Sequence, residues 1–111
     1  MEEEIEGVTI QFLKGKNAKN NTLIVSEANE NDLWFHVADM PSAHVIAKIH
    51  DLELTKEQYK SVIKRGAKIT KMFSKYSSCK TLQITYAEIK NVQITTTPGL
   101  VNLISFENII V

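Results

Sequence analysis

The sequence predicts an α+β fold, in which one long helix packs on a mixed or antiparallel sheet within a single domain. Three observations lead to this prediction. A chain of 111 residues suits one domain and can bury enough surface to fold alone. Segments with the two-residue alternation of strands lie before and after one segment with helical periodicity. No repeat and no linker rich in Gly, Ser or Pro divides the chain.

The first strand is expected over 7–13, where Val8, Ile10 and Phe12 alternate with polar residues. The polar segment 14–21 contains a glycine and is expected to be a loop. Residues 22–30 fit either a strand or a short helix, because three apolar residues precede Ser, Glu and Ala.

A hairpin is expected in the middle of the chain. Its strands are 32–39 and 43–49, with Pro41 in the turn. Trp34 and Phe35 are neighbours on the first of these strands, so they point to opposite faces. Burial of both rings is the simpler expectation, and stacking of one ring on a base is the alternative.

The long helix is expected over about 55–76. Thr55 is suited to be its N-cap, and Gln58 three residues later completes a capping box. Its apolar residues fall on one side at 100° per residue, and a stripe of lysines lies nearly opposite. The stripe consists of Lys56, Lys60, Lys64, Lys68, Lys71 and Lys75.

The rest of the chain is expected to complete the sheet. Residues 80–89 alternate as a strand, and 92–95 extend an edge. A turn over 95–99 leads to a closing hairpin that runs to the end of the sequence.

Charge is balanced overall but segregated along the chain. Thirteen basic and thirteen acidic side chains give no net charge. Residues 1–6 include four glutamates, and we expect them to form an acidic tail ahead of the domain at 7–111. Residues 56–80 contain eight basic residues and one acidic residue, Glu57.

No apolar run approaches the ~20 residues of a membrane span, and the acidic start does not resemble a secretory signal. One cysteine, Cys79, excludes an internal disulfide framework. We therefore expect a cytoplasmic protein with no membrane partner.

Catalytic and metal-binding chemistry have little support in the sequence. His36 and His44 flank the expected turn and could face each other, but without thiolates or clustered carboxylates they indicate a hydrogen-bonded or stacked pair better than a metal site. Cys79 has no neighbouring base that would activate it. We expect no enzyme activity and no metal or cofactor.

Two basic segments are candidates for contacting nucleic acid. The first is the lysine stripe, with Lys60, Lys64, Lys68 and Lys71 at its centre, which either tracks a phosphate backbone or is a solvated helix face. The scarcity of interleaved acids favours the phosphate-binding interpretation. The second is the loop 14–21, whose lysines and side-chain amides suit phosphates and base edges. Its candidate residues are Lys14, Gly15, Lys16, Asn17, Lys19 and Asn21.

Five separated elements resemble, in order, the NFACT-R domain family. DLWFHVADMPSAHVIAKI is similar to the family's most recognisable segment, and KGKNAKNN is similar to its Gly-Lys/Arg-Asn loop. The other three are the long helix ending in Phe73-Ser74, the strand ITYAEIKNV and the turn TPGLV. The resemblance extends over about residues 7–111.

The resemblance implies a non-catalytic RNA-binding module related to ribosome-associated quality control. It implies tRNA or rRNA and the large ribosomal subunit as partners, and a DNA backbone is the alternative nucleic acid. It singles out Gly15, Lys16, Asn17 and Asn21 in the loop and Trp34, His36 and His44 in the hairpin. The family's basic run is reduced to Lys90, and Thr97 replaces a lysine. A protein-interaction adapter that docks on the ribosome or on another protein is therefore the alternative, and a monomer or weak homodimer is expected.

Overall fold

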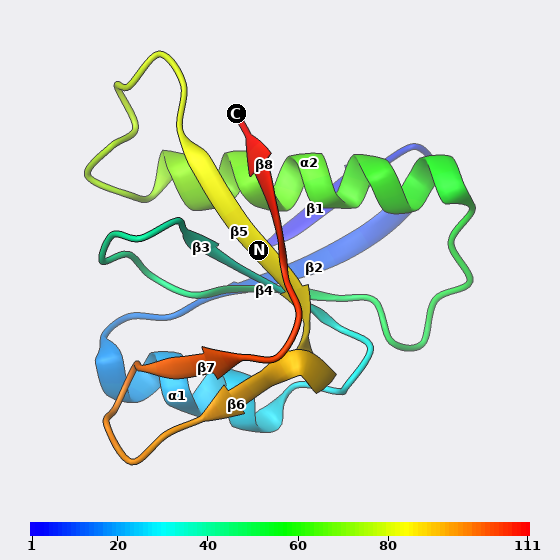
Figure 1. Ribbon diagram of the computed structural model, residues 1–111. Helices are drawn as coiled ribbons and strands as arrows, with labels where there is room; N and C mark the ends of the chain where they lie inside the picture. The colour runs from blue at the N-terminus through cyan, green and yellow to red at the C-terminus, as the bar shows by residue number, and fades with distance from the viewer.

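A computed structural model describes residues 1–111 and has the predicted α+β fold, with an antiparallel sheet between two helical layers (Figure 1). The main sheet has six strands in the order β1-β2-β4-β3-β5-β8. These strands are β1 (Glu2–Ile5), β2 (Val8–Lys14), β3 (Leu33–Val37), β4 (Val45–Lys48), β5 (Gln83–Glu88) and β8 (Glu107–Ile110).

The two faces of the sheet are covered differently. Helix α2 (Lys56–Met72) packs on one face. The other face is covered by α1 (Ala18–Glu27) and by a small sheet of β6 (Val92–Ile94) and β7 (Val101–Leu103). A short 3-10 turn, η1 (Ile89–Asn91), joins β5 to β6. Neither helix combines the length and apolar character that a membrane span requires.

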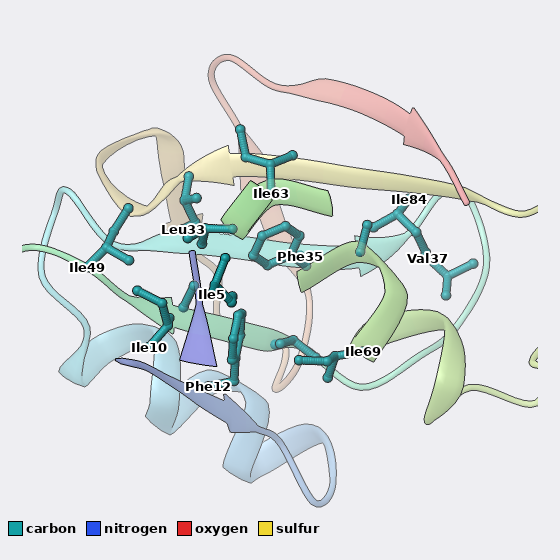
Figure 2. Close-up of a cluster of buried hydrophobic side chains, with 14 of the residues drawn as sticks. Ile5, Ile10, Phe12, Leu33, Phe35, Val37, Ile49, Ile63, Ile69 and Ile84 are labelled. Carbon is teal, nitrogen blue, oxygen red and sulfur yellow. The ribbon is translucent and has the colours of Figure 1, made fainter. Parts of the chain in front are cut away.

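Alternation along β3 divides the interior into two cores. Leu33, Phe35 and Val37 point toward α2 and pack with residues of β1, β2 and β5 (Figure 2). Trp34 points the other way, toward α1 and the small sheet. Both aromatic rings are buried, with Phe35 at 0% and Trp34 at 2% exposure. The prediction that both rings belong to the core is confirmed.

Helix α2 begins as the sequence predicts. The Thr55 hydroxyl accepts a hydrogen bond from the Gln58 backbone at 3.1 Å, and the Gln58 side chain accepts one from the Thr55 backbone at 2.9 Å. This reciprocal pair satisfies two backbone donors at the start of the helix. The helix ends at Met72, four residues short of the predicted limit.

Three sequence-based expectations differ from the structure. Residues 1–6 are not a tail, because Glu2–Ile5 pair with β2 and place Ile5 in the core. The segment 14–21 is not all loop, because Lys14 ends β2 and α1 begins at Ala18. The end of the chain is not a hairpin, because β7 pairs with β6 and β8 pairs with β5.

The first two differences have a local physical reason. Glu6 and Gly7 both have positive φ, which forms the tight turn between β1 and β2. The Asn17 side chain accepts a hydrogen bond from the Asn20 backbone at 2.8 Å, so this polar segment provides an N-cap rather than a loop. Residues 22–30, which fitted strand or helix, form most of α1 because its Ile24 and Val25 pack against Trp34.

We predict that Gly66→Ala destabilises the domain, even though alanine stabilises a helix by about 1 kcal/mol relative to glycine. A Cβ at this buried position would lie 2.3 Å from the Phe35 ring, which is fully enclosed and has no room to move. Overpacking of this kind costs about 1–3 kcal/mol, so we expect a net loss of about 1 kcal/mol in urea unfolding. The exposed Lys64→Ala on the same helix is the control, and equal stability of the two variants would contradict the prediction.

Candidate nucleic-acid interface

A groove of about 720 Å³ lies at one end of the sheet. It is formed by the connection between β2 and α1, the connection between β3 and β4, and the turn between β6 and β7, with Lys75 beyond α2. Its lining residues are Gly15, Lys16, Asn17, Ala18, Asn21, His36, Asp39, Met40, Pro41, Ser42, Ala43, His44, Lys75, Pro98, Gly99 and Leu100.

The start of α1 is fixed against the sheet by Gly15, Asn21 and His44. The Gly15 backbone donates to the His44 carbonyl at 2.9 Å, and the His44 backbone donates to the Asn21 side-chain oxygen at 3.2 Å. A Cβ on Gly15 would lie 1.6 Å from that same oxygen. Only glycine therefore allows the connection to pass this close to Asn21.

His44 is a buried neutral imidazole. Trp34 donates its indole N–H to His44 Nδ1 at 3.1 Å, so the ring proton lies on Nε2. Burial lowers the pKa of His44, a charge on neighbouring His36 lowers it further, and a hydrogen bond to the Gly99 backbone opposes these effects, so that the resulting pKa is about 4. Near neutral pH His44 is therefore a structural hydrogen-bonding group and carries no charge.

His36 connects the buried residues to the surface of the groove. Its ring stacks on Trp34 with centroids 5.6 Å apart and lies edge-on to His44 at 5.1 Å. Its Nδ1 donates to the Val37 carbonyl at 2.6 Å, which leaves Nε2 as the second polar atom of the ring. Burial lowers the pKa of His36. The two histidines thus lie edge to face, and each has its own hydrogen-bond partner, Trp34 for His44 and the Val37 carbonyl for His36. No group of three His, Cys, Asp or Glu side chains is placed to hold a metal.

Positive groups surround the groove. The first turn of α1 contains no acidic residue, and its backbone N–H groups lie at the positive end of the helix dipole. Lys16 and Lys75 line the groove from two different elements, and Asp39 is its one acidic lining residue. Close to this end of α2, the Lys14 ammonium lies 5.1 Å from the centre of the half-exposed Phe73 ring.

The structure thus brings Gly15, Lys16, Asn17, Asn21, His36 and His44 together around one groove. Trp34 supports this groove from below but is too buried to stack on a base. Lys19 lies outside it, in a separate recess on α1 with Leu23 and Ser26.

The lysine stripe is a separate surface along α2. Lys60, Lys64 and Lys68 are exposed on this helix, and Lys71 donates to the Val111 backbone oxygen at 3.1 Å. Acidic groups of the first hairpin contact the same helix, since Glu3 pairs with Arg65 at 2.6 Å and Glu6 accepts a hydrogen bond from Ser61.

The groove has two parts that the predicted site residues do not include. Lys75 belongs to the lysine stripe in the sequence, and the structure places it at the groove. The turn Pro98–Leu100 forms one wall, where the Gly99 backbone donates to Thr22 at 2.7 Å. The positive φ of Gly99 makes this turn possible, and the motif TPGLV was the available sequence signal.

Comparison with known proteins identifies the family. Residues 4–103 match the model described as the NFACT protein RNA binding domain, and the chain belongs to this family, as the sequence resemblance predicted. It is 29% identical over 92 residues to the Rqc2 homolog RqcH of Bacillus subtilis. These aligned residues make up 82% of this chain and 15% of RqcH.

The fold is also similar to a solved structure. The C-terminal part of the fibronectin/fibrinogen-binding protein from Streptococcus suis aligns with a TM-score of 0.81 and 25% identity. The alignment covers 99% of this chain and 43% of that one. The chain therefore spans less than half the length of either protein.

We predict that the buried histidines make the domain less stable in mild acid. The pKa of His44 falls from 6.5 to about 4 on folding, so the unfolded chain binds the extra proton as the pH falls below 6.5. The free energy of unfolding should therefore decrease by about 2 kcal/mol between pH 7 and pH 5, with His36 adding in the same direction.

Urea unfolding at a series of pH values measures this effect. His44→Asn keeps an acceptor for Trp34 but cannot be protonated, so its stability should vary less steeply with pH. A wild-type stability that stays constant over this range would contradict the assignment.

Proposed function

We propose that this chain is a non-catalytic RNA-binding module whose RNA occupies the groove at the start of α1. The observation that supports this most directly is the convergence of Lys16, Lys75 and the first turn of α1 on one concavity. Helix N-termini and lysines are both suited to phosphate groups, and here Lys75 joins Lys16 and the start of α1 from a segment far away in the sequence. The family description supports RNA as the nucleic acid.

The walls of the groove suit unpaired nucleotides better than a continuous duplex. Met40, Pro41 and Leu100 supply apolar surface for sugars and bases, and His36 supplies a ring edge with a hydrogen-bonding nitrogen. Sequence-dependent recognition of RNA mostly uses such single-stranded or looped segments, whose base edges are accessible. We therefore propose a loop or a single-stranded end as the bound segment.

Within RNA, we propose tRNA or rRNA at the large ribosomal subunit, in ribosome-associated quality control in the cytoplasm. The support is the family membership and the similarity to the Rqc2 homolog RqcH. A DNA backbone offers the same phosphates but lacks the 2′-hydroxyl groups. We propose that the chain acts as a monomer or weak homodimer.

The lysines divide into two roles in this proposal. Lys14, Lys16 and Lys75 contact phosphates at the groove, and Asn17 and Asn21 hold its floor in place. Lys19, Lys60, Lys64, Lys68 and Lys71 lie outside the groove and attract RNA at longer range.

We predict that Lys16→Glu with Lys75→Glu weakens binding to tRNA by at least about tenfold at low salt, because reversal of two charges places repulsion where phosphates bind. Fluorescence anisotropy at about 50 and 200 mM salt measures both affinity and its salt dependence. Loss of two phosphate contacts should make the log-log slope shallower by about 1.4 for single-stranded RNA.

The matched control is Lys60→Glu with Lys64→Glu, which reverses the same number of charges on the exposed face of α2. This control should weaken binding clearly less than the groove variant. A larger effect of the control would move the interface to the stripe. Absence of tRNA binding at low salt would contradict the proposal and favour the protein-interaction adapter.

A further inference from the structure

A second cleft lies at the opposite end of β3 from the groove. It has a volume of about 250 Å³ and is bounded by α2, the end of β5 and the turn before β8. Through Tyr59 and Glu88 it continues into a neighbouring recess of about 280 Å³ beside His50 and Leu52. The residues that line the cleft are Leu33, Tyr59, Tyr86, Ala87, Glu88, Asn91, Ser105, Phe106 and Glu107.

Two tyrosines and two glutamates meet in this cleft. Tyr86 and Glu107 are paired across β5 and β8, and the Tyr86 hydroxyl donates to Glu107 Oε2 at 3.0 Å. Burial raises the pKa of Tyr59, with the nearby charges of Glu88 and Glu107 adding to the effect. Burial and the bond to Glu107 raise the pKa of Tyr86 to about 12. Both phenol rings therefore stay neutral beside the two carboxylates.

The negative charge of the cleft has little compensation within the chain. None of its lining residues is Lys, Arg or His. Glu88 has one ion pair, with Lys90 at 3.4 Å, and the Lys90 side chain is half exposed. Exposed ion pairs of this kind contribute little, so the cleft keeps an attraction for an added cation.

The rim of the cleft is apolar. Phe106 is 52% exposed, and Ile104 beside it in the same turn is 63% exposed. A free inorganic cation would gain nothing from this surface, whereas a peptide would bury it. Aromatic residues and arginine are the residue types enriched at the centre of protein interfaces.

We propose that this cleft binds an arginine side chain of a protein partner. A guanidinium is planar, stacks on tyrosine rings and pairs with carboxylates through two parallel hydrogen bonds. Glu88 and Glu107 supply the charge, Tyr59 and Tyr86 supply the rings, and Phe106 contacts an apolar neighbour of the arginine. RNA is repelled by the same carboxylates.

This site is independent of the proposed RNA groove. The four steps along β3 from Leu33 in the cleft to Val37 near the groove span about 13 Å. One molecule can therefore hold a basic protein at one end and a second ligand at the other. Phe106 and Glu107 also lie beyond the residues that match the family model.

The probe for the experiment is the short peptide GSLRGRLSG, with GSLQGQLSG as its uncharged match. Titration into isotope-labelled protein, followed by amide NMR, should give saturable shifts at Tyr59, Phe106 and Glu107 with the arginine peptide and none with the glutamine peptide. Glu88→Gln with Glu107→Gln should weaken binding at least about tenfold. The glutamine oxygen at position 107 still accepts from Tyr86, which helps the variant to fold.

The matched control is Glu2→Gln with Glu4→Gln, which removes two exposed carboxylates from β1 and should leave peptide affinity unchanged. Equal weakening by the two double variants would reveal general charge attraction and overturn the proposal. Absence of saturable shifts would overturn it too. Shifts at the cleft that grow with protein concentration alone would identify a second copy of the chain as the occupant and would also contradict it.

Discussion

The arrangement of the candidate RNA groove depends on how His44 is held. Its backbone accepts a hydrogen bond from the Gly15 N–H and donates one to the Asn21 side-chain oxygen. Its ring accepts a hydrogen bond from the Trp34 indole. Three segments of the chain therefore meet at one residue, and the start of α1 cannot move without breaking these bonds. Because Nδ1 must accept, the arrangement requires a neutral ring, and burial at 1% exposure favours that form.

The start of β3 is fixed by a charged group, the Asp32 carboxylate, whereas the His44 ring is neutral. The fully buried Asp32 carboxylate accepts from the backbones of Asn29, Ile49 and His50 and contacts His50 Nδ1 at 3.0 Å. Burial alone would raise the pKa of Asp32, but these hydrogen bonds hold it below its usual value. β3 is thereby anchored just before its start by Asp32 and at Trp34 by His44. It is a rigid element between two clefts of opposite charge, and recognition by preformed clefts avoids part of the entropic cost of ordering.

Features with a local cause could be predicted from the sequence. The capping box at Thr55 and the alternation of Trp34 and Phe35 needed no knowledge of the rest of the chain. The start of α1 was missed because asparagines are weak helix formers, and its stability comes from contacts with distant residues such as Trp34 and His44. The partners of β7 and β8 were missed because pairing is a non-local choice that neither strand's own residues encode. For the same reason the groove was predicted only in parts: Gly15 and Gly99 are distant in sequence and meet only through the fold.

The two edges of the main sheet differ in a way that limits assembly. β1 presents Glu2 and Glu4 to solvent, whereas β8 ends in Ile110, which is 68% exposed. A strand added along β1 would face a row of carboxylates, which natural sheets use to prevent edge pairing. The β8 edge has one such carboxylate, Glu107, at its start. Growth into a fibre by edge pairing needs two receptive edges, and the glutamates of β1 disfavour one of them.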